Sequence, residues 1–306
     1  MVIVKNIKRS TNSINLTKTK YKSLQNYVPE ILHKNITFEL INTNCALANA
    51  IRRVLTNELP IKHLTVSLTD IYSDDKYIVD DIIKTRLEMI PIPQNIDTNI
   101  KYNIKYLNND ETYCNILSSE IKHNGKPISH GIKEIPICSI NSQHSLSVSD
   151  IIVTESYGYN NGRCSPGKIS YEVINYDIAN IDSCNSNPSD FKLGMEVSGV
   201  YNPDELIILG IDELLRRLEL IDFNDYVVEF NVYKLHINGE THTIGRLISR
   251  YVFNILPSID YCAMRIIHPS KRECVIDIRH SEGEKLVKQA IVNIVKDLNI
   301  IKNAFK

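Results

Sequence analysis

The stretch Leu40–Pro60, LINTNCALANAIRRVLTNELP, reads as the end of a strand, a polar turn and an amphipathic helix. A second stretch, Ile237–Pro257, INGETHTIGRLISRYVFNILP, repeats this pattern without a gap. The offset is constant, because 237 − 40 and 257 − 60 are both 197, and it places Arg53 on Arg250. Strand–turn–helix units are common in α+β proteins, but the shared register and the shared arginine favour two related modules in one chain.

Each module is expected to begin with a strand. Apolar and polar residues alternate in Ile36–Leu40 and in Val228–Val232, as they do in a strand with one buried face. In the helix that follows each polar turn, apolar residues recur at helical spacing and form one face. Pro60 and Pro257 are expected to end these helices, because proline disfavours helical geometry in the residue before it.

Two further helices are predicted in the second half of the chain. One begins at Pro203, which suits a first helical turn, and the other covers residues 282–303. The apolar stripe of the last helix is broad enough for burial on two sides, although it could simply cover its own sheet. We expect one core shared by the four helices, formed by Leu47, Ile51, Leu55, Ile211, Leu215, Leu218, Ile244, Leu247, Ile248, Tyr251, Leu286, Ile294 and Leu298.

Bulk composition limits the classes of function. The chain has 306 residues, room for about two domains. Its 35 basic and 36 acidic side chains give a net charge of −1, so any contact with DNA or RNA should be local or made through partners. No apolar run approaches the roughly 18 residues that span a bilayer. The seven cysteines have no clustered spacing, which favours reduced thiols in a cytosol-like compartment.

These patterns predict an α+β fold with four parts. Two strand–helix modules pair as a pseudo-heterodimer within one chain, and short strands and turns rich in Asn, Ser, Gly and Pro form an insert. Residues 180–190 are expected to form a surface loop. The expected boundaries are a loosely held arm over 1–35, the first module over 36–90 and 190–222, a β-rich insert over 91–189, and the second module over 223–306.

Several motifs resemble one family of proteins. Phe38–Pro60, Asp80–Ile92 and Lys192–Leu214 resemble, in order, motifs of the alpha-like proteins of RNA polymerase: the bacterial alpha N-terminal domain, the archaeal D polypeptide and the third-largest eukaryotic subunit. Gly239–Ile248 and the following His268–Pro269 are similar to the small partner of these proteins, the archaeal L polypeptide and its eukaryotic counterpart, the eleventh subunit. A fused pair of this kind looks like the arrangement found in some large cytoplasmic DNA viruses.

The resemblance implies a non-catalytic assembly platform of a DNA-directed RNA polymerase. Its modules would pair in cis, at an effective concentration of about millimolar, and hold the largest and second-largest subunits, alongside small subunits. Catalytic magnesium would lie in a partner, DNA and RNA would be contacted only indirectly, and the chain would act in the host cytoplasm and in virions. The implied interface residues are Asn49, Arg52, Arg53 and Arg86; arginine suits this role because its planar fork makes bidentate hydrogen bonds.

No metal or other cofactor is predicted on this chain. Eukaryotic family members often carry a four-cysteine zinc loop soon after the Ile-Pro motif, whereas the stretch that follows Pro91-Ile92-Pro93 here offers only Cys114 and Cys138. Zinc ligands usually come in close pairs, and the alternation of the flanking residues predicts buried, structural cysteines in the second module. The weaker candidates there recur every six residues, at Cys262, His268, Cys274 and His280.

Two other classes of function stay open at the level of sequence. The chain has no phosphate-binding loop and no Asp-rich magnesium motif. Cys164 in GRCSPG could serve a thiol hydrolase, although the segment lacks the spacing of a nucleophile elbow. A stand-alone dimerising scaffold unrelated to transcription is the other alternative, and it should purify without large partners.

Overall fold

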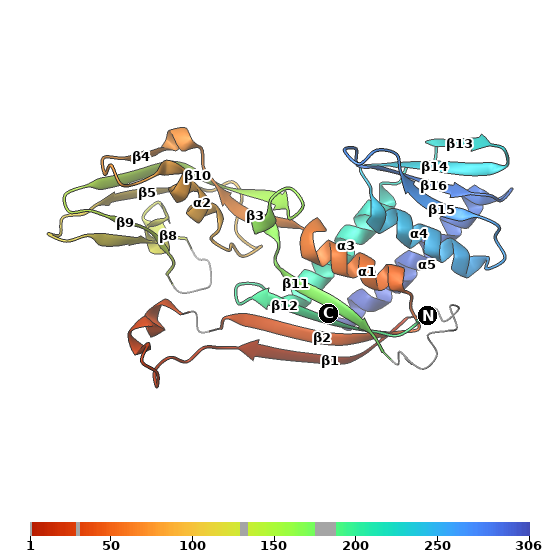
Figure 1. The fold of residues 1–306 in the computed structure, drawn as a ribbon, viewed down its shortest axis with the longest axis horizontal. Helices are drawn as coiled ribbons and strands as arrows, with labels where there is room; N and C mark the ends of the chain where they lie inside the picture. Colours follow the sequence, from red (N-terminus) through yellow and green to blue (C-terminus); the bar gives the residue numbers. More distant parts are fainter. Residues whose placement is uncertain (1, 29–30, 129–133, 175–187) are drawn as a thin grey trace.

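The computed structural model describes residues 2–28, 31–128, 134–174 and 188–306. Two four-stranded antiparallel sheets lie on either side of a layer of helices, and a third, β-rich body lies beside them (Figure 1). The predicted α+β class is confirmed. Residues 180–187 of the predicted surface loop lie outside the described residues.

The first sheet contains a strand that the sequence did not reveal. Its order is β1 (Ile3–Asn12), β2 (His33–Ile41), β12 (Phe191–Ser198) and β11 (Gly167–Val173). The expectation of a loosely held arm is wrong for β1, which pairs with β2 along its length. An edge strand needs few apolar residues, and Val4 and Ile7 are the two residues of β1 that pack against the core.

The second sheet has the order β13 (Tyr226–Glu229), β14 (Val232–Asn238), β16 (Glu273–Ile278) and β15 (Cys262–Ile266). The predicted strand over Val228–Val232 is wrong, because Phe230 and Asn231 have φ of 50° and 60° and form a two-residue hairpin turn. The strand that leads into the helix is β14, the position that the 197-residue offset assigns to it.

Four helices form the layer between the sheets: α1 (Cys45–Arg53), α3 (Pro203–Glu219), α4 (His242–Ile255) and α5 (Gly283–Ala304). The starts of α1 and α4 differ by 197 residues, and their N-cap residues, Asn44 and Thr241, show the same offset. Asn42 and Gly239 share that offset as well, and both have positive φ, 57° and 78°. The backbone therefore confirms the two related modules inferred from the sequence.

The helical layer joins the two sheets into one core. Helices α1 and α3 pack on β12, whereas α4 packs on β15 and β16. Helix α5 contacts both β14 and β1, so it reaches from the second sheet to the first. At its end, the ring of Phe305 meets the ring of Phe38 edge-to-face at 4.9 Å between centroids. Before Pro60, α1 continues as a π-helical turn, Val54–Glu58.

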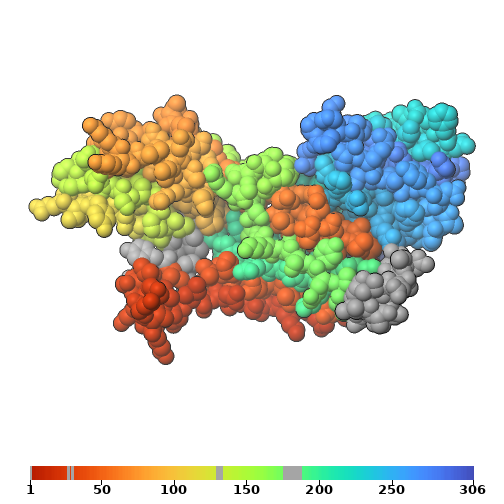
Figure 2. Space-filling model, viewed as in Figure 1, coloured from red at the N-terminus to blue at the C-terminus, as the bar shows by residue number. Residues whose placement is uncertain are grey.

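The insert has a core of its own. Its strands are β3 (Pro60–Thr65), β4 (Ile71–Ser73), β5 (Lys101–Leu107), β6 (Cys114–Leu117), β7 (Lys122–His123), β8 (Lys126–Pro127), β9 (Pro136–Ile140) and β10 (Ser145–Tyr157), with helix α2 (Asp80–Glu88). Its buried apolar residues begin at Leu64 and end at Val153. In Figure 2, the insert and the second module form two lobes joined through the first module.

The expected domain boundaries differ from the observed packing at two places. Residues 60–90 were expected in the first module, but Leu64, Ile83 and Leu87 point into the core of the insert. Strand β11 was expected in the insert, but Ile169 packs into the core of the modules. Neither boundary between the two cores coincides with a change in amino-acid composition. The strands on both sides of each boundary have a similar alternation of apolar and polar residues.

Candidate functional site

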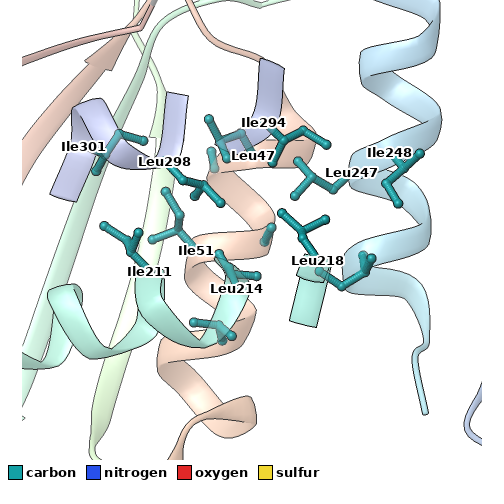
Figure 3. Packing of buried hydrophobic residues seen from close by; sticks show 14 of the residues in the cluster. Leu47, Ile51, Ile211, Leu214, Leu218, Leu247, Ile248, Ile294, Leu298 and Ile301 are labelled. Carbon is teal, nitrogen blue, oxygen red and sulfur yellow. The ribbon is translucent and has the colours of Figure 1, made fainter. Parts of the chain in front are cut away.

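The junction between the two modules is the most extensive candidate site of the chain. Helix α1 packs against α4, and α3 packs against α5 (Figure 3). Of the residues that the sequence placed at this junction, twelve are buried in one core and Leu215 is partly buried against it. The twelve are Leu47, Ile51, Leu55, Ile211, Leu218, Ile244, Leu247, Ile248, Tyr251, Leu286, Ile294 and Leu298.

A buried ion cluster lies at one side of this junction. Arg217, near the end of α3, has a side chain that is 6% exposed. Its Nε donates to Glu240 Oε1 at 2.6 Å, its Nη2 donates to Glu240 Oε2, and its Nη1 donates to Glu58 Oε2 at 2.7 Å. Glu58 ends the π-helical turn of the first module, and Glu240 precedes α4 of the second. One guanidinium thus joins both modules with a bidentate and a single contact.

Two further side chains complete the coordination of Glu58. Thr243 donates its hydroxyl hydrogen to Glu58 Oε1 at 2.7 Å, and it accepts a hydrogen bond from Arg53 Nε at 2.8 Å. Arg53 Nη2 also lies 2.9 Å from Glu58 Oε1. Both oxygens of a buried carboxylate are therefore satisfied, which offsets the free energy of taking it out of water.

The cluster fixes the charge states of Glu58 and Arg217. Burial alone would raise the pKa of Glu58, but the charge and hydrogen bond of Arg217, with smaller contributions from Thr243 and Arg53, hold it below its ordinary value. Burial would lower the pKa of Arg217, and the contacts with Glu240 and Glu58 raise it instead. The two modules are therefore held together by fixed charges at neutral pH.

The ion cluster occurs at only one of the two places that the internal repeat relates. By the 197-residue offset, Glu58 corresponds to Ile255 and Thr243 corresponds to Ala46. On that other side, the buried Nε of Arg250 has no hydrogen-bond partner among the described residues. In a pair of two first modules, Glu58 would face Ala46 and lose the hydroxyl of Thr243. The hydrogen bonds of the buried Glu58 carboxylate are therefore complete only when a first module pairs with a second module, and not when two first modules pair.

A second contact links the modules beside the ion cluster. The guanidinium of Arg272, in the second module, lies 4.1 Å from the centroid of the Tyr159 ring, which follows β10. The Tyr159 ring stacks on that of Tyr157 at 5.0 Å, and its backbone N–H donates to Asn57. The chain that returns from the insert therefore also meets the second module.

The predicted partner-facing residues have different surroundings. Arg52 is half-buried, and its Nε and Nη2 both donate to Asn49 Oδ1 at 3.0 Å. Arg53 takes part in the ion cluster instead of facing solvent alone. Arg86 lies in the insert and donates from Nη1 to the carbonyl of Ile137 at 2.8 Å. The structure brings Asn49, Arg52 and Arg53 together on one helix and places Arg86 elsewhere.

Four side chains of the ion cluster, Glu58, Arg217, Glu240 and Thr243, were not predicted from the sequence. Arg217 and Glu58 are 159 residues apart, and each could belong to an ordinary solvated helix surface. Glu240 and Thr243 lie within the recognised Gly239–Ile248 motif, but no local pattern reveals what they contact. One sequence signal pointed to a buried role for Arg217. This charged residue directly precedes Leu218 within the apolar stripe of its helix.

The cysteines within the described ranges are not gathered into one reactive or metal-binding group. Cys164 is fully buried, and burial raises the pKa of its thiol, the opposite of what a nucleophile needs. Cys262 and Cys274 are buried on neighbouring strands, where each is paired with a different residue of the other strand. Among the described residues, no group of three or more His, Cys, Asp and Glu side chains could hold a metal ion.

Comparison with known proteins gives two adjacent family matches. The model for the RNA polymerase Rpb3/Rpb11 dimerisation domain matches residues 37–218, and a second model with this description matches residues 233–304. Across the described residues, no helix has both the length and the apolar character needed to cross a membrane.

Three relatives show how far the similarity extends. The DNA-directed RNA polymerase RPB3-11 homolog of African swine fever virus is 22% identical over 315 residues, which cover 87% of this chain and 86% of the relative. RNA polymerase II subunit RPB3 of Schizosaccharomyces pombe is 32% identical over 111 residues, 35% of this chain and 37% of the relative. RNA polymerase subunit Rpo3 of Archaeoglobus fulgidus is 40% identical over 62 residues, 20% of this chain and 23% of the relative.

Proposed function

This chain belongs to the RNA polymerase Rpb3/Rpb11 dimerisation-domain family, and on that premise we propose that it is the platform on which the two largest subunits of a viral RNA polymerase assemble. As a family member it is a non-catalytic subunit of a DNA-directed RNA polymerase. The observation that carries the proposal is the junction: two unlike modules share one apolar core and one buried ion cluster.

Pairing in cis gives this platform a fixed shape before any partner arrives. Arg217 and Glu240 hold the modules in one orientation, and the apolar faces of the four helices are buried in one shared core. A preformed platform loses little conformational entropy when a large subunit binds.

The RPB3-11 homologs of African swine fever virus are similar over 87% of this chain, which supports a viral polymerase acting in the host cytoplasm.

Arg52 is the leading candidate for contact with a large subunit. Its guanidinium is fixed by Asn49, yet no carboxylate among the described residues lies within ion-pair distance of it. A held but uncompensated cation on a helix surface suits an acidic side chain or backbone carbonyls of a partner. Arg53 is a weaker candidate, because its guanidinium is already used within the junction.

The test is co-expression of the tagged chain with the two largest subunits, followed by affinity purification and a transcription assay. The unaltered chain should recover both subunits and RNA synthesis, whereas Arg52→Glu should reduce recovery of at least one of them by about tenfold or more. Lys105→Glu, an equal charge reversal at an exposed position of β5, is the matched control. Recovery of the folded chain alone would favour a stand-alone scaffold and overturn the proposal.

A further inference from the structure

The second sheet is one strand wider than the helical layer that covers it. Tyr226 and Val228 of β13 lie opposite Leu235 and Tyr233 of β14, so they share the face on which α5 packs. Tyr233 and Leu235 are buried, whereas Tyr226 and Val228 are 45% and 61% exposed. The apolar face of β13 is therefore left without a cover.

An open groove lies where that cover is missing. It has a volume of about 1120 Å³ and runs between β13 and the first turns of α5. Its apolar lining comes from Tyr226, Val228, Phe230 and Tyr233. Within it, the buried hydroxyl of Tyr233 has no hydrogen-bond partner among the described residues. A groove with these properties is incomplete as part of an isolated core.

The backbone edge of β13 is open as well. Among the described residues no strand pairs with its outer side. Asp225 accepts a hydrogen bond from the backbone N–H of His236 across the hairpin. Because N–H groups alternate in direction along an antiparallel strand, those of Tyr226 and Val228 point outward. Two backbone donors are thus available to a further strand.

The corresponding edge strand of the first sheet, β1, is protected against pairing with a further strand, whereas β13 is not. Strand β1 occupies the same place in its sheet order, and it carries Lys5 and Lys8 around an irregularity at Asn6, where φ is 52°. Lysines and bulges are the usual protection of an edge strand against further pairing. Strand β13 has neither, since its four residues are Tyr226, Val227, Val228 and Glu229.

The hairpin tip adds a second unusual feature. Phe230 is 97% exposed and has a φ of 50°, a left-handed backbone conformation that is unfavourable for a bulky side chain. The isolated chain gains nothing visible from an exposed ring at this position. Exposed apolar side chains beside an open groove are typical of surfaces that contact another protein.

We infer that β13 receives an extended segment of another polymerase subunit as a fifth strand of the second sheet. The occupant would pair with the outward backbone groups of Tyr226 and Val228 and direct alternate apolar side chains into the groove. It should carry little charge, because the basic and acidic side chains at the groove balance and two of the acids are already paired, Glu282 with Lys285 and Glu284 with Lys288. This inference rests on the proposed function.

Hydrogen exchange in the purified polymerase tests the inference directly. The amides of Tyr226 and Val228 should exchange about tenfold or more slowly in the polymerase than in the free chain. If the large subunits co-purify but these amides exchange as in the free chain, the inference fails and the proposed function stands. If no large subunit co-purifies, both fail. Slow exchange in the free chain together with a dimer in light scattering would identify a second copy as the occupant and overturn the inference.

A pair of substitutions separates backbone pairing from side-chain contact. Val228→Pro removes an outward N–H without removing a β13–β14 hydrogen bond, whereas Val228→Ala shortens the side chain and keeps the N–H. We expect Val228→Pro to lower the recovery of one subunit about tenfold, and Val228→Ala to lower it severalfold less. Equal losses for the two variants would exclude strand pairing. Circular dichroism and the unfolding midpoint confirm that both variants are folded.

Discussion

The guanidinium of Arg217 forms a bidentate pair with the carboxylate of Glu240. This pair joins the last turns of the first module's final helix to the turn that leads into the first helix of the second module. Only 23 residues separate these partners in sequence, but they belong to different modules. Glu58 brings a third segment to the same guanidinium. The contact therefore sets the orientation of two modules that an apolar core alone would hold less specifically.

Replacing Arg217 with methionine should weaken the whole junction. Arg217→Met preserves much of the side-chain volume but leaves Glu58 and Glu240 buried without their cation. We expect a loss of about 3–5 kcal/mol in the free energy of unfolding at pH 7, measured by chemical denaturation. Arg246→Met is the control, because Arg246 is exposed on α4, has no ion pair among the described residues, and should contribute at most about 1 kcal/mol. Equal effects at the two positions would contradict a special role for Arg217.

The stability of the junction should fall in acid through Glu58. Because the folded pKa of Glu58 is depressed, its contribution is present above the unfolded pKa of about 4.3 and is lost as the pH falls through the folded value. Glu58→Gln should cost about 2 kcal/mol at pH 7 and progressively less below pH 4.3, so the two unfolding free energies converge. The exposed Glu219→Gln serves as control. A constant difference between pH 7 and pH 3.5 would refute this assignment.

Removal of metal ions should leave the protein unchanged. The buried thiols of Cys138, Cys262 and Cys274 have pKa values raised by burial, to about 11, 11 and 12, which disfavours the thiolate that zinc requires. We expect less than about one zinc per ten chains by elemental analysis, and the same thermal midpoint with and without a chelator. A midpoint lowered by the chelator would point to a site that this prediction excludes.

How much could be predicted from the sequence depended on the range of each interaction. The four helices and the repeat were readable because apolar periodicity and turn residues such as Asn42 and Gly239 are local signals. The ion cluster was not readable, because Arg217 and Glu58 acquire their roles only when distant segments meet. Strand β1 was missed for a third reason: an edge strand with a mostly polar sequence has almost no periodic signal.

The tip of the β13–β14 hairpin offers a prediction in which stability and assembly move in opposite directions. Phe230→Asn places a residue that tolerates positive φ at a position where phenylalanine is strained. Because the ring of Phe230 is 97% exposed, its loss removes almost no buried contact in the free chain. We therefore expect the free energy of unfolding to rise by about 1 kcal/mol.

Phe230→Ala separates the two effects, because alanine also loses the ring but keeps the unfavourable backbone conformation. Thermal and chemical denaturation should show a gain for Phe230→Asn and none for Phe230→Ala. Recovery of the subunit that binds β13 should fall for both variants, since both lack the ring. A strained and exposed phenylalanine would then be explained by what it contacts in the assembled polymerase. If recovery were unchanged in both variants, Phe230 would take no part in that contact.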